Sequence, residues 1–517
     1  MTRRTVDWPA VSTLAAALAL GVFAMNPLPI GAFHDDARYL LLARSIAEGT
    51  GYRFVMLPGM PPGTHFPPAF PLLLAALWKV APAFPASVMV FKLLNALLLP
   101  VASFAAFVFA RDRAGLAPWV ATGVALAFAG SVPILFLDGL LFSEPFFIAA
   151  MLGSLMLAER AVRRPGGTGE GGGSLARLAF VAGMSIGAVT MIRSIGIALG
   201  AGFAVTLLLR RQWRDLALAT AGIAVFVAPW QLWTMRHGAA IPPLLSGDYG
   251  TYTSWMGVAL RAEGAGFVAR VVAANLAGFR ILLVLFGANA ALQAGVAVTL
   301  LVALVPGVAR LARRAPVSVA STAAYLLVVL IWPGAPDRFL WPVWPIMLTG
   351  VACGASEISA RNTASAGRRI ARAAMLAALA VCALLFVRFN VGMYGSRAWE
   401  GPASANAKIG LALAAAASGL PEGLVATDFD GLVSLYTGRP AVPLLPLVAV
   451  NYLRRRTPDE AAAQLSGILD AYHPRFLLVG TTEAVEAAQR LEHTNPPRIR
   501  FGGVTPSGVL LYVAISP

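Results

Sequence analysis

The chain has 517 residues, of which 58% are hydrophobic and 12% are charged, whereas soluble domains carry about 25% charged residues, so an ordinary soluble protein is excluded. The net charge is +16 and the pI about 10.8, but the arginines stand in short clusters between apolar runs, as the positive-inside rule requires of a membrane protein. We therefore expect a multi-pass helical membrane protein and no nucleic-acid partner.

The apolar runs predict about eleven membrane helices within residues 1–392. In chain order they are Trp8–Ile30, Ala86–Ala110, Leu116–Pro133, Leu140–Ala158, two short helices within 178–209, Leu216–Met235, Ile281–Val305, Val317–Ile331, Leu340–Ile358 and Ala373–Val391. Arg3 and Arg4 precede the first helix without a clear small-residue cleavage site, so we expect this helix to be retained. With these arginines cytoplasmic, the later basic clusters are cytoplasmic too. The loop Arg160–Arg177 is Gly-rich and predicted to be flexible and inert.

The segment His34–Pro71 is too polar to cross a membrane and follows the first predicted helix. It opens with Asp35 and Asp36, continues as an amphipathic helix to Ala47, and then turns through several prolines. Such a segment must lie at a membrane surface. We expect it to form the floor of an active site there, within a first outer loop of residues 34–85 that contains amphipathic helices.

Beyond about residue 392, the apolar runs shorten, and predicted strands alternate with predicted helices. The predicted strands are Leu424–Asp428, Phe476–Gly480 and Val509–Ile515, and the predicted helices are Pro458–Tyr472 and Thr482–Leu491. This alternation predicts a small extracytoplasmic α/β domain over residues 393–517. The predicted fold class is thus a polytopic α-helical membrane protein with a small C-terminal α/β domain.

Ionisable side chains gather at the predicted outer ends of the helices. They are Glu144, Arg193, Asp337 and Arg338, at the same predicted depth as Asp35, Asp36 and His65. A charged side chain inside a membrane span costs about 2.5–3.5 kcal/mol on insertion scales, so its presence needs a reason. Because none of these residues is predicted near the cytoplasmic face, the pattern indicates a functional site.

Each of these residues also has a structural interpretation. Asp35 and Asp36 can cap the helix that follows them, Glu144 can be the ion-pair partner of Arg193, and Arg338 can extend to the lipid headgroups. His65 is more often structural than catalytic. A divalent metal at Asp35, Asp36 and His65 stays open, but their spacing matches no metal motif. The polar segment Arg236–Arg280, which includes Asp248 and Tyr249, is either an acceptor path or a plain amphipathic loop.

Five short motifs follow one another along the chain in an order that resembles a known family. They are Asp35-Asp36-Ala37-Arg38-Tyr39, His65–Pro68, Ser143-Glu144-Pro145, Arg193 between short helices, and Arg338–Pro342 with Pro345. Over residues 8–392 this order resembles the GT-C superfamily of polyprenyl-phosphate-sugar-dependent glycosyltransferases, in particular its protein-mannosyltransferase and aminoarabinose-transferase-like branch. The family usually has Asp-Glu where this chain has Asp35-Asp36, and Arg-Tyr where it has Arg338-Phe339.

The resemblance implies transfer of a hexosyl or pentosyl group, with inversion, from a polyprenyl-phosphate donor to a hydroxyl of a glycan, lipid or protein. It places the reaction at the outer face of a bacterial inner membrane. An inverting transfer needs one base, and Asp35 matches that position, with Asp36 beside it. A leaving phosphate needs positive charge, which Arg193 and Arg338 supply. The other expected substrate-binding residues are Glu144, His65, Asp337 and Tyr39, and no cofactor is certain.

Two other classes of function remain as alternatives. Glu144 and Arg193 could form the coupling pair of a secondary transporter, although transporters place such groups near the bilayer midplane and often contain internal repeats. No repeat is evident in this sequence. The third alternative is a non-catalytic scaffold whose C-terminal tail binds a partner.

Overall fold

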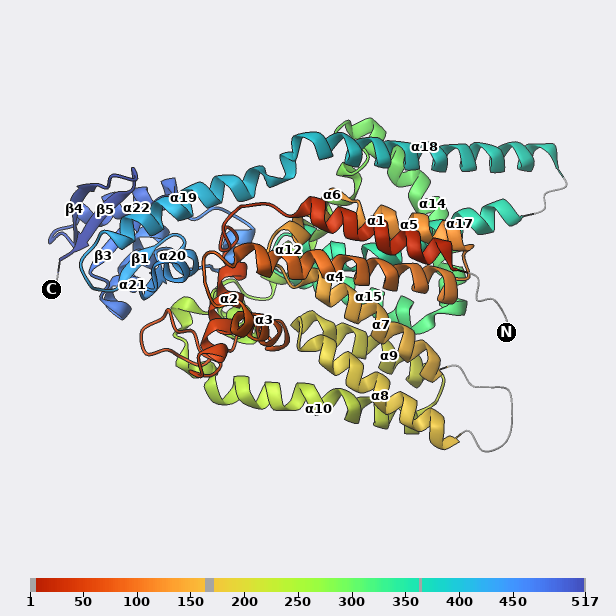
Figure 1. Cartoon of the computed structure of the whole chain (residues 1–517), viewed down its shortest axis with the longest axis horizontal. Helices are drawn as coiled ribbons and strands as arrows, with labels where there is room; N and C mark the ends of the chain where they lie inside the picture. The colour runs from red at the N-terminus through yellow and green to blue at the C-terminus, as the bar shows by residue number, and fades with distance from the viewer. Residues whose placement is uncertain (1–5, 163–171, 362–364, 516–517) are drawn as a thin grey trace. The chain divides into compact units, whose positions relative to one another are not determined.

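The computed structural model describes residues 6–162, 172–361 and 365–515, and Figure 1 follows the chain from the N-terminus to the C-terminus. Half of the predicted loop Arg160–Arg177, residues 163–171, lies outside these residues. Both ends of the predicted loop are helical, so the loop is shorter than predicted. The chain divides into two compact units. We call Met1–Met25, Lys92–Pro229 and Val272–Trp399 the helical unit, and Asn26–Phe91, Trp230–Val271 and Glu400–Pro517 the mixed unit.

The helical unit contains most of the apolar helices. The helices that lie wholly or mainly in it are α1 (Trp8–Ala24), α4 (Val88–Val108), α5 (Pro118–Ala129), α6 (Val132–Gly139), α7 (Glu144–Val162), α8 (Gly172–Thr190), α9 (Ile197–Leu209), α10 (Trp213–His237), α12 (Gly266–Gly278), α13 (Ile281–Val284), α14 (Ala290–Arg314), α15 (Pro316–Ile331), α16 (Asp337–Leu340), α17 (Trp344–Ala360) and α18 (Ala366–Ser396). Within the described residues, seven helices are long and apolar enough to cross a membrane, or eight if the bent pair α5–α6 is one span. Five more apolar helices are shorter. The chain is thus a polytopic α-helical membrane protein, as predicted.

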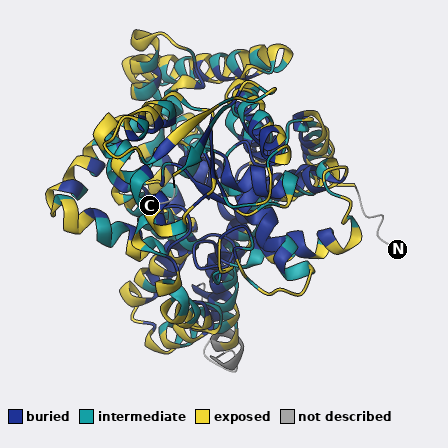
Figure 2. Cartoon of the chain, turned by 90° about the vertical axis from the view of Figure 1, so that its left-hand side faces the viewer, coloured by how far each residue is buried: buried dark blue, intermediate teal, exposed yellow. Residues whose placement is uncertain are grey.

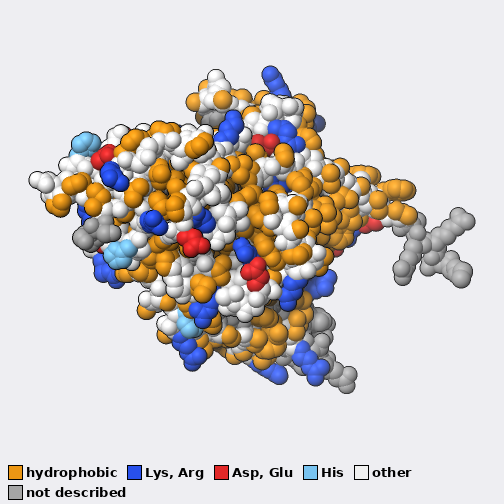
Figure 3. Space-filling model, turned by 60° about the vertical axis from the view of Figure 1, so that its left-hand side comes forward, with side chains coloured by type: hydrophobic (Ala, Val, Ile, Leu, Met, Phe, Trp, Pro, Cys, Tyr) orange, Lys and Arg blue, Asp and Glu red, His pale blue; other side chains and the backbone are white. Residues whose placement is uncertain are grey.

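Exposed apolar side chains support this assignment. Val101, Leu301 and Leu384, on α4, α14 and α18, each expose half or more of their surface. Hydrophobic side chains cover much of the face drawn in Figure 3, and exposed residues are yellow in Figure 2. Apolar surface on this scale is unfavourable in water but suits a hydrocarbon environment.

Two regions differ from the predicted helices. The helix expected from Ile281 instead ends as α13 (Ile281–Val284), and α14 starts at Ala290. Gly287 has φ +129°, and the Asn289 side chain accepts the Leu292 N–H at 3.0 Å, so the intervening residues stop one helix and cap the next. Part of the predicted polar segment is helical as well, as α11 (Tyr252–Glu263) and α12 (Gly266–Gly278), and Gly266–Val284 is itself apolar enough to span a membrane.

The predicted helix Leu116–Pro133 is also two helices. The axes of α5 and α6 differ by 58°, and the Asn390 side chain of α18 accepts the Val132 N–H at 2.7 Å at the break. Asp138, predicted in a short loop, is instead fully buried in α6. The following helix begins at Glu144 rather than at Leu140, so Glu144 is the first residue of α7.

Glycines bring helices of this unit into close contact. A Cβ added to Gly354 of α17 would lie 1.8 Å from the Ala303 carbonyl oxygen of α14, and one added to Gly307 would lie 1.8 Å from that of Gly350. The two backbones therefore touch, which is the packing that small residues permit between membrane helices.

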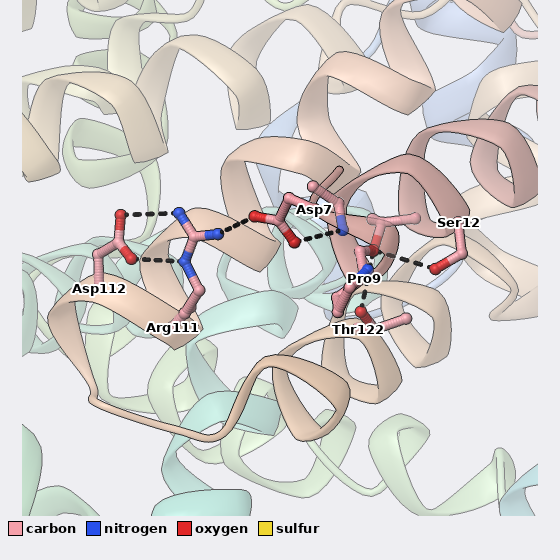
Figure 4. Close-up of polar contacts among 8 residues, drawn as sticks. Asp7, Pro9, Ser12, Arg111, Asp112 and Thr122 are labelled. Carbon is pink, nitrogen blue, oxygen red and sulfur yellow. Dashed lines mark hydrogen bonds and ion pairs between the residues drawn. The ribbon is translucent and has the colours of Figure 1, made fainter. Parts of the chain in front are cut away.

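Polar contacts fasten the start of α1 to its neighbours (Figure 4). Arg111 follows α4 in the chain. Its guanidinium group pairs with Asp7 at 2.7 Å and with Asp112 at 2.6 Å. The Thr122 hydroxyl of α5 donates to the Pro9 carbonyl oxygen at 3.1 Å. These contacts lie at the end of the helices that the charge pattern assigns to the cytoplasm.

The mixed unit is built around a five-stranded sheet of order β2-β1-β3-β5-β4. Its strands are β1 (Val425–Thr427), β2 (Ala441–Pro443), β3 (Phe476–Val479), β4 (Ile499–Val504) and β5 (Leu510–Ala514). Its α-helices are α2 (Asp35–Ala47), α3 (Ala69–Val80), α11 (Tyr252–Glu263), α19 (Gly401–Ser418), α20 (Asp430–Thr437), α21 (Pro458–Tyr472) and α22 (Thr482–Glu492). Strands β2, β1 and β3 are parallel, and β5 and β4 pair antiparallel. The three predicted strands and two predicted helices are confirmed, whereas β2, β4, α19 and α20 were not predicted.

Candidate functional site

Three of the predicted residues form one cluster in the helical unit. The Glu144 carboxylate lies 2.5 Å from the Arg193 guanidinium and 2.5 Å from the Arg338 Nε. Arg193 also donates to the Ser143 hydroxyl at 3.2 Å, and the Arg338 guanidinium lies 4.0 Å from the centre of the Phe142 ring. Residues about 50 and 190 positions apart in the sequence are thus brought to one carboxylate.

Local structure explains how these side chains converge. Glu144 is the first residue of α7, Arg193 is extended between the end of α8 and the 3₁₀ turn Ser194–Gly196, and Arg338 lies in the short helix α16. Each therefore stands at a helix end, where a side chain can turn toward its neighbours. The predicted pairing of Glu144 with Arg193 is confirmed, and Arg338 joins the pair.

The cluster has a graded exposure. The Glu144 side chain is 0% exposed, that of Arg193 is 10% exposed, and that of Arg338 is 24% exposed. The three groups together carry one net positive charge. Asp337, predicted beside Arg338, is exposed at the start of α16. Fixed guanidinium groups of this kind can donate two hydrogen bonds to a phosphate or carboxylate.

The two predicted catalytic acids belong to the mixed unit and differ in environment. Asp35 is the first residue of α2 and is half-buried. Asp36 is fully buried, and its carboxylate accepts the N–H groups of Gly31 at 2.6 Å and Phe33 at 3.3 Å. Burial raises the pKa of Asp36 against these hydrogen bonds. Asp36 therefore fastens the turn before α2.

A buried charge cluster near these acids was not predicted. Arg38 pairs with Asp248 at 2.8 Å and with Asp430 at 3.6 Å. The Tyr249 hydroxyl donates to Asp430, the Tyr249 ring lies 4.5 Å from the Arg38 guanidinium carbon, and the Leu447 N–H donates to Asp248 at 2.7 Å. Burial raises the pKa of Tyr249 well above its usual value, so the hydroxyl stays a donor. Asp248 and Tyr249 are thus internal to the unit, where they are paired with Arg38 and Asp430.

His65 and Tyr39 lie in the same unit and are buried. The His65 Nδ1 lies 2.7 Å from the Gly250 carbonyl oxygen and must carry the proton of that hydrogen bond. Burial lowers the pKa of His65, which keeps the ring neutral. The Tyr39 ring lies 4.6 Å from that of Phe66 and edge-on to that of Phe70. The hydrogen bond of His65 and the ring contacts of Tyr39 are thus internal contacts that hold the fold.

Other features of the described chain do not coincide with these residues. Within it, no group of three or more His, Cys, Asp or Glu side chains is arranged to hold a metal ion. An open groove of about 1010 Å³ lies beside α22, with Glu486, Arg490 and Phe501 among its lining residues. None of the predicted site residues lines this groove, so its size does not identify the reaction site.

Comparison with known proteins extends these observations. No family model and no curated protein sequence matches the chain. Solved structures do match. Apo ArnT, the aminoarabinose transferase from Cupriavidus metallidurans, is 13% identical, with a TM-score of 0.54 over 98% of this chain and 97% of that one. ArnT bound to undecaprenyl phosphate gives 0.53 at 13% identity, over 98% of both chains.

Another solved enzyme matches too. It is the archaeal oligosaccharyltransferase AglB from Archaeoglobus fulgidus, solved with an inhibitory peptide and a dolichol-phosphate. It is 14% identical, with a TM-score of 0.50 over 98% of this chain and 74% of that one. At these identities the likeness establishes the fold alone. The fold predicted from the motif order is confirmed: this chain has the GT-C fold.

Proposed function

We propose that the protein is a membrane glycosyltransferase that moves a sugar from a polyprenyl-phosphate donor to a hydroxyl acceptor at the outer face of a bacterial inner membrane, with inversion. The observation that carries the proposal is the Glu144 cluster, in which a buried carboxylate holds two guanidinium groups and one of them stays partly exposed. Two solved proteins of the same fold contain a polyprenyl or dolichol phosphate.

In this proposal the arginines bind the donor phosphate. Glu144 fixes the Arg193 and Arg338 guanidinium groups before the lipid arrives, so little side-chain entropy is lost on binding. As the sugar leaves, negative charge grows on the phosphate oxygen, and pre-oriented donors stabilise that charge most in a site of low dielectric. Asp337, exposed beside Arg338, belongs to the proposed substrate-binding set. His65 and Tyr39 are buried within the outer loop and support this set by packing rather than by contact with the substrate.

Asp35 is the proposed base. The acceptor oxygen bonds to the anomeric carbon as the bond from that carbon to the phosphate oxygen breaks. The hydroxyl proton passes to the Asp35 carboxylate, and the electron pair of the broken bond stays on the lipid phosphate. Asp35 holds the position that the family resemblance gives to the base and is half-buried, whereas Asp36 is fully buried and accepts two backbone N–H groups. We therefore assign proton transfer to Asp35 alone and a supporting role to Asp36.

A binding experiment tests the phosphate site. The purified protein in nanodiscs is titrated with undecaprenyl phosphate, and binding is followed by native mass spectrometry. Arg338→Gln should weaken binding by about 10–100-fold, since a hydrogen bond to a charged group contributes about 1.5–3 kcal/mol. Arg310→Gln is the matched control, because Arg310 also pairs with a glutamate, Glu357, in the helical unit. Equal affinity in Arg338→Gln and Arg310→Gln would remove the phosphate site from this cluster.

A cellular experiment tests the reaction. The gene is deleted, and envelope glycans are compared by mass spectrometry with those of strains that express the wild type or Asp35→Asn. The deletion should lose one glycan modification, the wild type should restore it, and Asp35→Asn should not, although its undecaprenyl phosphate affinity stays unchanged. Full restoration by Asp35→Asn would contradict the base assignment.

A further inference from the structure

The residue before Asp35 has an unusual backbone. His34 has φ 59° and ψ −58°, and the Asp35 N–H donates to the Phe33 carbonyl oxygen at 2.6 Å. These values describe a classic γ-turn, which is rare and strained. Strain of this kind persists only where the surroundings fix the backbone, and it is concentrated at functional sites. The contacts around His34 therefore show what the strain maintains.

The turn is fastened first from the helix that it begins. The fully buried Asp36 carboxylate accepts the N–H groups of Gly31 and Phe33. Gly31 has φ +111°, and a Cβ there would lie 2.7 Å from the Leu432 Cβ, so the loop also passes directly against α20. The backbone on both sides of His34 is thus held by contacts that involve neither the His34 ring nor the Asp35 side chain.

The His34 ring provides a second attachment. It stacks on the Phe429 ring, with 4.9 Å between ring centres and 9° between ring planes. Phe429 belongs to the hydrophobic core of the C-terminal sheet. Its neighbour Asp428 accepts the N–H of Gly480 at 2.7 Å and both the N–H and the hydroxyl of Thr481, at 3.0 and 2.9 Å. The ring therefore rests on a segment tied to two parallel strands.

The first turn of α2, which follows His34, also contacts the residues next to Phe429. Arg38 pairs with Asp430, and a Cβ added to Gly431 would lie 3.2 Å from the Ala37 Cβ and 3.6 Å from the Arg38 Cγ. The start of α20 thus lies in close contact with the first turn of α2. Together, the stack and the ion pair attach α2 on both sides of Asp35 to the residues Asp428–Gly431, which we call the β1–α20 turn.

We propose that His34 is a positioning residue. Through the stacked His34 ring, the β1–α20 turn holds Asp35 in the orientation that proton transfer requires. The inference rests on the proposed role of Asp35 as the base. It gives the C-terminal sheet a part in the reaction and assigns the imidazole the role of a flat contact surface rather than a proton carrier. An aromatic ring without nitrogen should therefore serve in its place.

Three variants of the full-length protein test this inference, in nanodiscs for hydrogen exchange and lipid binding and in the deletion strain for the glycan product. His34→Ala removes the stack, His34→Phe retains it, and His473→Ala is the matched control, because His473 is another positive-φ histidine of the mixed unit, at the end of α21. Hydrogen exchange of residues 31–38, undecaprenyl phosphate binding and restoration of the glycan in the deletion strain are measured for each.

His34→Ala should accelerate exchange in residues 31–38 and lower the glycan product, by as much as about 100-fold, because small displacements of a catalytic group have effects of that size. Undecaprenyl phosphate affinity should stay within twofold. His34→Phe should return exchange and product toward the wild-type values, and His473→Ala should change neither. Failure of His34→Phe to restore the product would overturn the inference, since the ring nitrogens would then be required.

The outcomes separate this inference from the proposed function. Unchanged exchange in His34→Ala overturns the positioning role, whatever Asp35 does. If exchange changes as expected but Asp35→Asn makes normal product, the base assignment fails, and the catalytic meaning of the turn fails with it. Loss of undecaprenyl phosphate binding in His34→Ala would also contradict the inference, because a positioning residue for the base should leave the phosphate site intact.

Discussion

Glu144 illustrates how a charge is tolerated inside the helical unit. A carboxylate without water contact is strongly disfavoured unless it is paired, and the Glu144 Oε1 lies 2.5 Å from both the Arg193 and the Arg338 guanidinium groups. Such an arrangement contributes little to net stability compared with apolar packing, but the loss of one member leaves buried charge behind. A weak contribution to stability agrees with the proposed role of the cluster in binding a phosphate.

Glu144→Gln should destabilise the protein by about 3 kcal/mol, because two guanidinium groups lose the charge that compensates them. Unfolding of the detergent-solubilised protein measures the change. Glu357→Gln is the control, since the pair of Glu357 with Arg310 is longer, at 3.5 Å, and more exposed, and it should change stability by less than about 1 kcal/mol. Equal effects of the two substitutions would contradict the prediction.

His65 gives a prediction about pH. Because burial lowers its pKa, the folded state binds this proton less tightly than the unfolded state. The corresponding stability is present above the unfolded pKa of about 6.5 and is lost as the pH falls through it toward the folded pKa.

His65→Gln keeps a donor for the Gly250 carbonyl oxygen but cannot titrate, so the fall in melting temperature between pH 7.5 and 5.5 should be smaller than in the wild type. Thermal melts at the two pH values measure the difference. Parallel falls in the wild type and His65→Gln would show that His65 does not titrate in this range.

At the scale of elements, the helix pair α14–α17 depends on the absence of side chains. Gly307 and Gly354 face backbone atoms of the partner helix. The close contact between the two helix backbones leaves no room for a methyl group at either position. Gly295 lies in the same α14, with nothing within 4 Å of its added Cβ. The same substitution should therefore have opposite effects at the two kinds of site.

Gly354→Ala should destabilise the protein by about 1–3 kcal/mol, the usual cost of overpacking. Gly295→Ala should be neutral or stabilise it by up to about 1 kcal/mol, since alanine is the better helix former. Unfolding transitions of the two variants, recorded under identical conditions, measure this contrast. A stable Gly354→Ala protein would mean that α14 and α17 can separate without penalty.

Element types were predictable where the signal is local. The capping box of Thr457 with Glu460 and the apolar period after it define α21, and the gap between the short helices at Arg193 was visible in the apolar pattern. The start of α14 was misplaced although Gly287 and Asn289 marked the break. The Arg38 cluster could not be predicted, because its acids lie far along the chain and no local pattern pairs them with Arg38.

The environment of Asp36, at the candidate site, could not be predicted from the local sequence either. Two adjacent acids are equivalent in the sequence, and only the path of the preceding loop turns one of them inward to the Gly31 and Phe33 N–H groups. The Glu144 cluster was closer to prediction, since a charge within an apolar segment requires a partner and only a few arginines were available at the same predicted depth.

For the whole molecule, the charge pattern predicts an orientation. Basic residues at the ends of α9, α14 and α17 should face the cytoplasm, and the C-terminal sheet should face outward. The two cysteines, Cys353 and Cys382, are buried and can be replaced by alanine to give a background for labelling.

In that background, Thr482→Cys should react in intact cells with a membrane-impermeant maleimide. Arg211→Cys, at the turn between α9 and α10, should react only after permeabilisation. Both positions are exposed on the protein, so differences in reactivity report the side of the membrane. Labelling of Arg211→Cys from outside would reverse the predicted orientation and remove the outer face as the place of reaction.

The mixed unit gathers three separate stretches of chain, which affects how the protein is made. Arg38 is synthesised early, Asp248 midway and Asp430 near the end, so a nascent polypeptide has both acidic partners of Arg38 only when its last fifth emerges. Premature termination before Asp430 should consequently yield a product that cellular proteases recognise and remove, even when every apolar helix has already entered the bilayer.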